Sequence, residues 1–122
     1  MEPKSTVLYK SRHFAVRIMH LIQYLSKGRR PYFIIDQIGR AGTSIAANVT
    51  EAQRAISKKE FLQKMYIAYK ECGETLYWID LLHEAEYITE DAYRSLSEDC
   101  REIEKMLTII TKTTTENLRR KI

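Results

Sequence analysis

The chain has 122 residues, of which 44% are hydrophobic and 30% are charged, with 4 Gly and 2 Pro. This length fits one domain with a proper core, and the apolar content excludes a disordered chain. The net charge is +4, but residues 1–59 hold 11 Lys/Arg and 3 Asp/Glu, whereas residues 60–122 hold 9 and 13. The basic first half suggests an anionic partner or an electrostatic rule for self-assembly. The alternative is that the two halves neutralise each other within one bundle.

The sequence predicts neither a membrane-spanning helix nor a signal peptide. Its apolar runs are far shorter than the about 20 residues of a membrane span. The N-terminal residues MEPKSTVLYKSRHF lack the apolar core of a signal peptide. Cys72 and Cys100 fall on apolar stripes, which suits buried free thiols in a reducing compartment better than a disulfide. We therefore expect a cytoplasmic protein without a membrane partner.

The first predicted helix spans about residues 6–27, and Gly28 ends it. Its apolar residues recur every three or four positions and are Phe14, Ile18, Leu21 and Leu25. The second predicted helix starts near Pro31 and continues to about Ala55. Its apolar stripe is Ile35, Ile38, Gly42, Ile45, Val49, Ala52 and Ile56. We expect Gly39 and Gly42 to loosen or bend this helix.

A second stripe of small and polar residues follows the same helix. It consists of Ala41, Ser44, Asn48, Glu51 and Ala55. A helix with two such faces sits centrally in its bundle or contacts another subunit, so Asn48 and Glu51 are expected to be buried and paired. The alternative is that both are ordinary exposed residues. The segment is not a phosphate-binding loop or a serine elbow, because it lacks both GxxxxGK[ST] and G-x-S-x-G.

The third and fourth helices complete the predicted fold. The third spans about residues 57–87 and opens with a capping box from Ser57 to Glu60; Gly73 in its middle indicates close packing at that level. The fourth is capped by Thr89, and its C-terminal end carries cations that suit the helix dipole, Lys112, Arg119, Arg120 and Lys121. Four amphipathic helices with short loops predict an all-α, up-down-up-down antiparallel bundle in one domain, residues 1–122.

The candidate nucleic-acid-binding residues belong to the first helix and the turn after it. They are Lys10, Arg12, Arg17, Lys27, Arg29 and Arg30. Lys10 and Arg17 are seven residues apart and share a helical face, so a basic stripe there would bind phosphates without reading sequence. The alternative is a solvated basic face with no ligand.

A second candidate set is polar and structural. Glu71 and Glu74 lie three residues apart on the third helix, and we expect them to anchor Arg40 and Arg54 of the second helix in an ion-pair network. Acid–base work by the two carboxylates is the alternative. Metal binding and cofactors are not expected, because His13, His20 and His83 are scattered and no Glu-x-x-His pair occurs. The eight tyrosines are typical of a core and of protein interfaces. The alternative is that some of them stack on nucleic-acid bases.

Two spaced motifs carry a resemblance to a known family. The first reads Gln37-x-x-Arg40-Ala41-x-x-Ser44-Ile45-x-x-Asn48-Val49-x-Glu51, followed by Arg54. The second reads Ile67-Ala68-x-Lys70-Glu71-x-x-Glu74-Thr75-x-Tyr77-Trp78-Ile79-x-Leu81-Leu82. Together they resemble the signatures of the four-helix-bundle family named for the 23S rRNA intervening-sequence protein. The similarity runs from Phe14 to about Ile110, and Ala52 departs from it where Gly is usual.

The resemblance implies antiparallel four-helix protomers that join as barrel-like homopentamers, with no established enzymatic activity. A related branch serves as the accessory protein of diversity-generating retroelements, where a basic surface is thought to bind nucleic acid and a reverse transcriptase. We therefore expect a non-enzymatic oligomeric module that binds RNA or DNA through a basic surface, with a protein partner as a further expectation. The alternative is a purely structural or protein-binding oligomer without nucleic acid.

Overall fold

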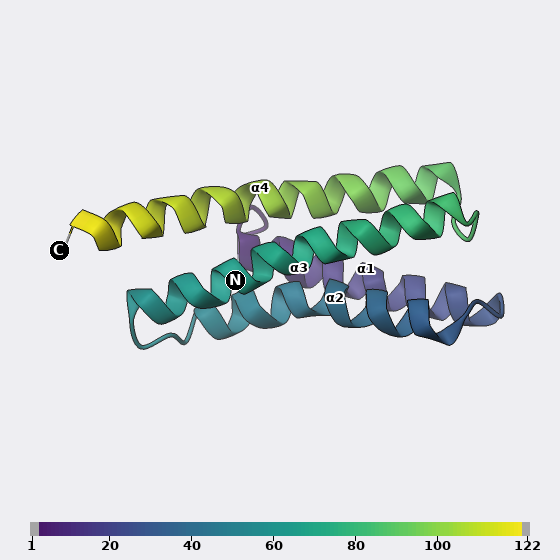
Figure 1. Cartoon of the computed structure of the whole chain (residues 1–122), viewed down its shortest axis with the longest axis horizontal. Coiled ribbons are helices and arrows are strands. Elements are labelled where there is room, and N and C mark those ends of the chain that lie inside the picture. The colour runs from purple at the N-terminus through teal and green to yellow at the C-terminus, as the bar shows by residue number, and fades with distance from the viewer. Residues whose placement is uncertain (1–2, 121–122) are drawn as a thin grey trace.

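Four antiparallel helices form the described part of the chain in the computed structural model, residues 3–120 (Figure 1). They are α1 (Val7–Lys27), α2 (Tyr32–Ala52), α3 (Lys58–Glu84) and α4 (Glu90–Arg120). No strand occurs in these residues, and the predicted all-α bundle is confirmed. Lys121, predicted to extend the basic end of the last helix, lies outside the described residues.

The helix ends follow the local signals in the sequence. At the start of α3, the Ser57 hydroxyl oxygen accepts from the Glu60 N–H at 3.1 Å, and the Glu60 carboxylate accepts from the Ile56 N–H at 3.2 Å. Thr89 likewise accepts from the Ala92 N–H at the start of α4. These contacts satisfy N–H groups that have no partner within the helix, and they confirm the predicted caps.

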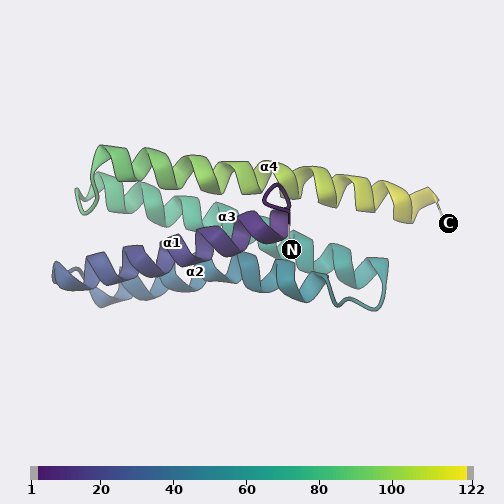
Figure 2. The ribbon, with the colours of Figure 1, turned by 180° about the vertical axis from the view of Figure 1, so that it is seen from behind.

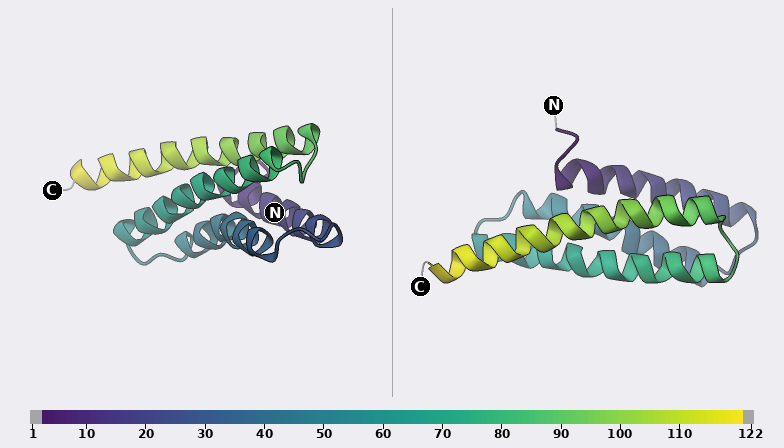
Figure 3. Two further views of the ribbon diagram at one scale, coloured as in Figure 1. Left: turned by 45° about the vertical axis from the view of Figure 1, so that its right-hand side comes forward. Right: turned by 90° about the horizontal axis from the view of Figure 1, so that it is seen from above.

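The bundle is uneven around its circumference. α1 packs along α2, α2 along α3 and α3 along α4, whereas α1 and α4 contact each other only slightly. α4 has 31 residues and α1 has 21, so α4 continues well past the beginning of α1 (Figures 1, 2 and 3). The last turns of α4 therefore lack α1 as a neighbour and lie beside the N-terminal part of α3.

Two glycines of α2 permit a close approach of α1. A Cβ atom at Gly42 would lie 2.6 Å from Cγ1 of Ile18, and one at Gly39 would lie 2.7 Å from Cδ1 of Ile22. The helix is uninterrupted from Tyr32 to Ala52, so the two glycines do not break it. Gly73 is the reverse case. It is exposed, and a Cβ there would meet nothing within 4 Å, which contradicts the predicted close packing.

The two cysteines are buried free thiols, as predicted. The Cys100 thiol donates to the carbonyl oxygen of Cys72 at 3.6 Å across α3 and α4. A hydrogen bond with Cys100, together with burial, raises the pKa of the Cys72 thiol far above its ordinary value. A thiol held protonated in this way is a poor nucleophile and a core residue.

Candidate nucleic-acid interface

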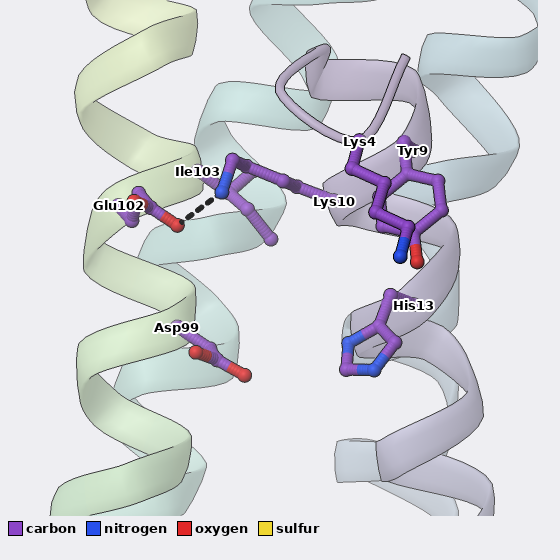
Figure 4. Close-up of a pocket in the computed structure, with 7 residues that line it drawn as sticks. All are labelled: Lys4, Tyr9, Lys10, His13, Asp99, Glu102 and Ile103. Atoms are coloured by element: carbon purple, nitrogen blue, oxygen red, sulfur yellow. Dashed lines mark hydrogen bonds and ion pairs between the residues drawn. The ribbon is translucent and has the colours of Figure 1, made fainter. Parts of the chain in front are cut away.

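Two of the four basic residues predicted on α1 form ion pairs within the protein. Lys10 reaches across to α4, where its Nζ lies 3.0 Å from the Glu102 carboxylate (Figure 4). Arg17, two turns further along α1, also contacts α4: its Nη1 lies 2.6 Å from the Asp99 carboxylate and its Nη2 lies 3.0 Å from the hydroxyl of Ser95. These contacts join the two helices that pack least closely. Lys10 and Arg17 of the predicted phosphate-binding stripe are therefore paired with acids of α4.

The cations of the α1–α2 turn have different roles. The Arg30 guanidinium lies over the Tyr87 ring at 4.7 Å, and its Nη1 donates to the carbonyl oxygen of Gly28. It thereby ties this turn to the α3–α4 turn. Lys27 and Arg29 are exposed, as is Arg12 on α1, and none of these three has an ion pair within residues 3–120. Only half of the predicted set is thus available to a ligand.

A groove between α1 and α4 gathers both signs of charge. It is lined by Lys4, Tyr9, Lys10, His13, Asp99, Glu102 and Ile103 (Figure 4). Two ammonium groups face two carboxylates there, and one cation is already paired with one of the acids. Such a balanced groove does not concentrate positive potential, so it is a poor site for a polyanion.

The predicted ion-pair network between α2 and α3 does not form. Arg40 bonds instead to Asp36, one turn back on α2, with Nε 3.0 Å from the nearer carboxylate oxygen. Arg54 has no ion pair in the described chain. Glu71 and Glu74 therefore face each other without an arginine. Burial, followed by the neighbouring Glu74 carboxylate, raises the pKa of Glu71.

Asn48 and Glu51 are separated by the structure. Asn48 is buried, and its Nδ2 donates to the Ser44 carbonyl at 2.9 Å and to the Ser44 hydroxyl at 3.1 Å. Its predicted burial and pairing are confirmed. Glu51 is exposed, and its nearest cation is Lys64 at 3.8 Å, so the predicted burial of Glu51 was wrong.

A polar cluster at the α3–α4 turn was missed by the sequence reasoning. The His83 ring stacks on Tyr93 at 3.9 Å, and its Nε2 lies 2.9 Å from Glu90. The Tyr93 hydroxyl donates to Asp80. The signal was available in the spacing, since each helix supplies two of these residues three positions apart beside a short turn.

This cluster can hold a proton but has no nucleophile beside the imidazole. Within residues 3–120, Glu90 is the hydrogen-bond partner of His83, and no hydroxyl or thiol bonds to that ring. Hydrogen bonds from His83 and Arg94 lower the pKa of Glu90. The arrangement fits an exposed structural contact across the turn better than nucleophilic catalysis, which needs an activated hydroxyl or thiol.

The richest group of cations lies at the end of the bundle where α2 passes into α3 and where α4 terminates (Figures 1 and 2). We call this group the basic end; it consists of Arg54, Lys58, Lys59, Lys112, Arg119 and Arg120. The opposite end holds both signs of charge: acidic residues of the α3–α4 turn lie there with the cations of the α1–α2 turn, namely Glu84, Glu86, Glu90 and Asp91 with Lys27, Arg29 and Arg30. Cations therefore gather in excess at the basic end, whereas the two signs are mixed at the opposite end.

A groove between α3 and α4 opens at the basic end. We call it the tyrosine groove; it is lined by Tyr66, Tyr69, Thr108, Thr111, Lys112, Thr115, Glu116 and Arg119. The two tyrosine rings lie 5.9 Å apart between centroids and are tilted by 36°. All of its lining residues belong to the first part of α3 and the last part of α4.

An aromatic patch lies on α2 and α3 toward the other end. It consists of Phe33, Tyr77 and Trp78, with the Trp78 ring 4.9 Å from Tyr77 and 6.4 Å from Phe33. Phe33 and Tyr77 are 62% and 54% exposed, although aromatic rings usually gain by burial. The buried Nε1 of Trp78 has no hydrogen-bond partner within residues 3–120. An exposed ring pair around an unsatisfied N–H is typical of a surface that another molecule covers.

Comparison with known proteins gives the family. Residues 3–109 match the family described as 23S rRNA-intervening sequence protein. The chain belongs to this family. A crystal structure of a protein of unknown function from the S23 ribosomal protein family, from Bacteroides thetaiotaomicron, is 45% identical, with a TM-score of 0.85. The match covers 88% of this chain and 99% of that one. No curated protein matches this chain significantly. Within the described residues, no helix has both the length and the apolarity needed to cross a bilayer.

Proposed function

We propose that this member of the family is a non-enzymatic, self-associating module that binds nucleic acid through its basic end. The observation that carries the proposal is the gathering there of five cations that form no ion pair in the described chain. Within residues 3–120, Arg54, Lys59, Lys112, Arg119 and Arg120 form no ion pair. On α1, by contrast, Lys10 and Arg17 are occupied by acids of α4.

Phosphate recognition by this end would be independent of sequence. Lysine and arginine contacts to a nucleic-acid backbone release counterions and fix position, but they carry no base information. The net charge of +4 is modest, so the local excess of cations at the basic end, rather than the total charge, concentrates positive potential there. The buried thiols fit the cytoplasm as the compartment in which such a module would work.

The direct test is binding of a labelled mixed-sequence oligonucleotide, followed by fluorescence anisotropy over a series of salt concentrations. We expect Arg54→Gln, Lys59→Gln and Arg120→Gln, combined in one variant, to weaken binding. Each lost phosphate contact should flatten the plot of log affinity against log salt by about 0.7–0.9. Glutamine is an unbranched polar residue with a helix preference similar to that of lysine and arginine, and it removes their charge.

The matched control removes three charges from the surface first predicted from the sequence. The combined substitutions Arg12→Gln, Lys27→Gln and Arg29→Gln change the net charge equally, but they lie outside the basic end. This control should bind nearly as the parent does. No binding by the parent at low salt, or equal losses in both variants, contradicts the proposal.

A second candidate function is self-association without nucleic acid, and the aromatic patch favours it. Phe33 of α2 and Tyr77 of α3 expose large apolar rings, and Gly73, one turn before Tyr77 on α3, is exposed as well. A surface of this kind suits either a second copy of the chain or another protein partner. The two candidates use different surfaces, so the charge variants above should leave the mass of the assembly unchanged.

A further inference from the structure

We propose that the tyrosine groove holds the unpaired bases of a single-stranded nucleic acid. The inference rests on the proposed function, because the basic end supplies the phosphate contacts beside the groove. The inference specifies that the bound nucleic acid is single-stranded, and it names the residues that distinguish a single strand from a duplex. The two aromatic rings of this groove come from α3, and its cations and threonines come from α4.

The two tyrosines have different roles: Tyr69 supports the ring of Tyr66, and Tyr66 contacts the base. Tyr69 is partly buried and packs against the hydrophobic core, which fixes its ring. Tyr66 is 52% exposed and leans on Tyr69 at 5.9 Å. One face of Tyr66 is thus available to a planar ligand while its position is held from behind. Base stacking on such a ring is tolerant of sequence because every base has a π-face.

The opposite wall is made of threonines whose hydroxyl hydrogens are already used. Thr108 donates to the Glu104 carbonyl at 2.9 Å, Thr111 to Leu107 at 2.8 Å, and Thr115 to Thr111 at 2.8 Å. Each hydroxyl oxygen keeps a lone pair that can accept from a base amino or imino group. This wall therefore offers methyl groups and acceptors, which suits base edges better than phosphates.

Phosphates would be held by two cations on the same face of α4. Lys112 and Arg119 are seven residues apart, which is two turns, or about 10.5 Å along the axis. Glu116 lies between them and forms no ion pair in the described chain. Its carboxylate repels an anionic ligand, so it lowers the affinity for nucleic acid. A neutral side chain at this position would remove the repulsion.

A duplex and a second copy of the chain fit these features less well. Paired bases keep their faces inside the stack, so a duplex could use the cations but not Tyr66. A symmetric contact between two copies at this groove would bring two basic ends together, which costs electrostatic energy. The groove is therefore better matched to a flexible anion that carries planar rings.

The test compares a 12-nucleotide mixed-sequence single strand with its duplex, using fluorescence anisotropy of the full chain. Tyr66→Leu should weaken single-strand binding by about tenfold, within the range found when a stacked aromatic residue is removed. Tyr66→Phe keeps the ring and should bind within about twofold of the parent. Duplex affinity should change little in both variants, because the phosphate contacts remain.

Matched variants separate stacking from charge. Tyr24→Leu removes a tyrosine of α1 that is exposed to the same degree, 54%, and it should have no effect on binding. The combined Lys112→Gln and Arg119→Gln variant should flatten the salt dependence, whereas Tyr66→Leu should leave its slope unchanged. Glu116→Gln should tighten binding.

The outcomes distinguish this inference from the proposed function. If the parent binds neither oligonucleotide at low salt, both fall. If the parent binds and the Arg54, Lys59 and Arg120 variant loses affinity while Tyr66→Leu does not, the inference alone is wrong. It is also wrong if Tyr66→Leu weakens duplex and single strand equally. A change in assembly mass without a change in affinity would make the groove a contact between subunits.

Discussion

Glu71 and Glu74 place two carboxyl groups side by side on α3 without an arginine between them. Burial and the Glu74 carboxylate raise the pKa of Glu71, with Lys70 as the opposing influence. A carboxyl group with a raised folded-state pKa binds its proton more tightly in the folded than in the unfolded chain. Its ionisation therefore disfavours the fold at neutral pH, and this loss disappears as the pH falls toward the unfolded value.

Glu71→Gln should therefore raise the free energy of unfolding at pH 7, because it removes a partly desolvated charge beside another carboxylate. The gain should be below about 1 kcal/mol, since Glu71 is only partly buried. It should shrink at pH 4, where the carboxyl group of the parent is protonated in both states. Urea unfolding at the two pH values measures it, and the control is Glu98→Gln at an exposed site. Equal gains at both pH values would contradict the assignment.

Arg17 and Glu51 test which ion pairs contribute to stability. Arg17 is partly buried and binds Asp99 at 2.6 Å as well as Ser95, whereas Glu51 lies 3.8 Å from Lys64 at the surface. We expect Arg17→Ala to lower the free energy of unfolding by about 1 kcal/mol and Glu51→Ala to change it by less than about 0.5 kcal/mol. The same urea titrations provide the measurement. A larger loss for Glu51 would restore the buried role that its sequence position predicted.

At the scale of the helices, two glycines in similar sequence settings have opposite packing. Gly42 faces α1, where the Ile18 side chain fills the space that a Cβ would need, while Gly73 faces solvent. Both lie inside helices, so alanine has the same intrinsic advantage of about 1 kcal/mol at each position. Their difference in stability upon substitution should therefore report packing alone.

Gly73→Ala should raise the free energy of unfolding by about 1 kcal/mol. Gly42→Ala should lower it by about 1–3 kcal/mol, because the Ile18 side chain must shift in a packed core. Thermal unfolding followed by circular dichroism compares the two variants directly. A gain at Gly42 would mean that the α1–α2 interface yields easily. A loss at Gly73 would mean that another surface packs against this face of α3.

The sequence predicted what depends on neighbours along the chain. Helix periodicity, the Ser57 and Thr89 caps and the core cysteines are local or face-specific signals, and the structure agrees with them. Which acid meets which base is decided by helix rotation and by the relative position of α1 and α4. The periodicity of the sequence does not encode helix rotation or helix position. Lys10 and Arg17 were therefore predicted to bind a ligand rather than acids of α4, and Arg40 was predicted to pair with α3 rather than with Asp36.

The basic end was missed for a related reason. Its cations come from the α2–α3 turn and from the end of α4, which are more than 50 residues apart in the sequence. They meet because α4 is long enough to run past the start of α1 toward that turn. The sum of charges over each half of the sequence pointed to α1 and the turn after it instead, although acids of α4 pair there with Lys10 and Arg17.

At the scale of the whole molecule, we expect the aromatic patch to be a contact between copies of the chain. We expect light scattering to give a mass above the 14.4 kDa of one chain, with five copies as the favoured number. Phe33→Ser and Tyr77→Ser together should reduce that mass, because they remove the exposed apolar area that a second copy would bury. Tyr24→Ser, at an exposed ring of α1, is the control. A parent that is monomeric at micromolar concentration contradicts self-association.

The central claim is that the basic end, rather than α1, meets nucleic acid. Photo-cross-linking of the full chain to a single-stranded oligonucleotide, followed by mass spectrometry of the digested protein, tests it most directly. We predict cross-linked peptides from residues 54–69 and 108–120, with Tyr66 as the modified aromatic residue. Cross-links confined to residues 7–30, or none under conditions in which the oligonucleotide binds, would contradict the account.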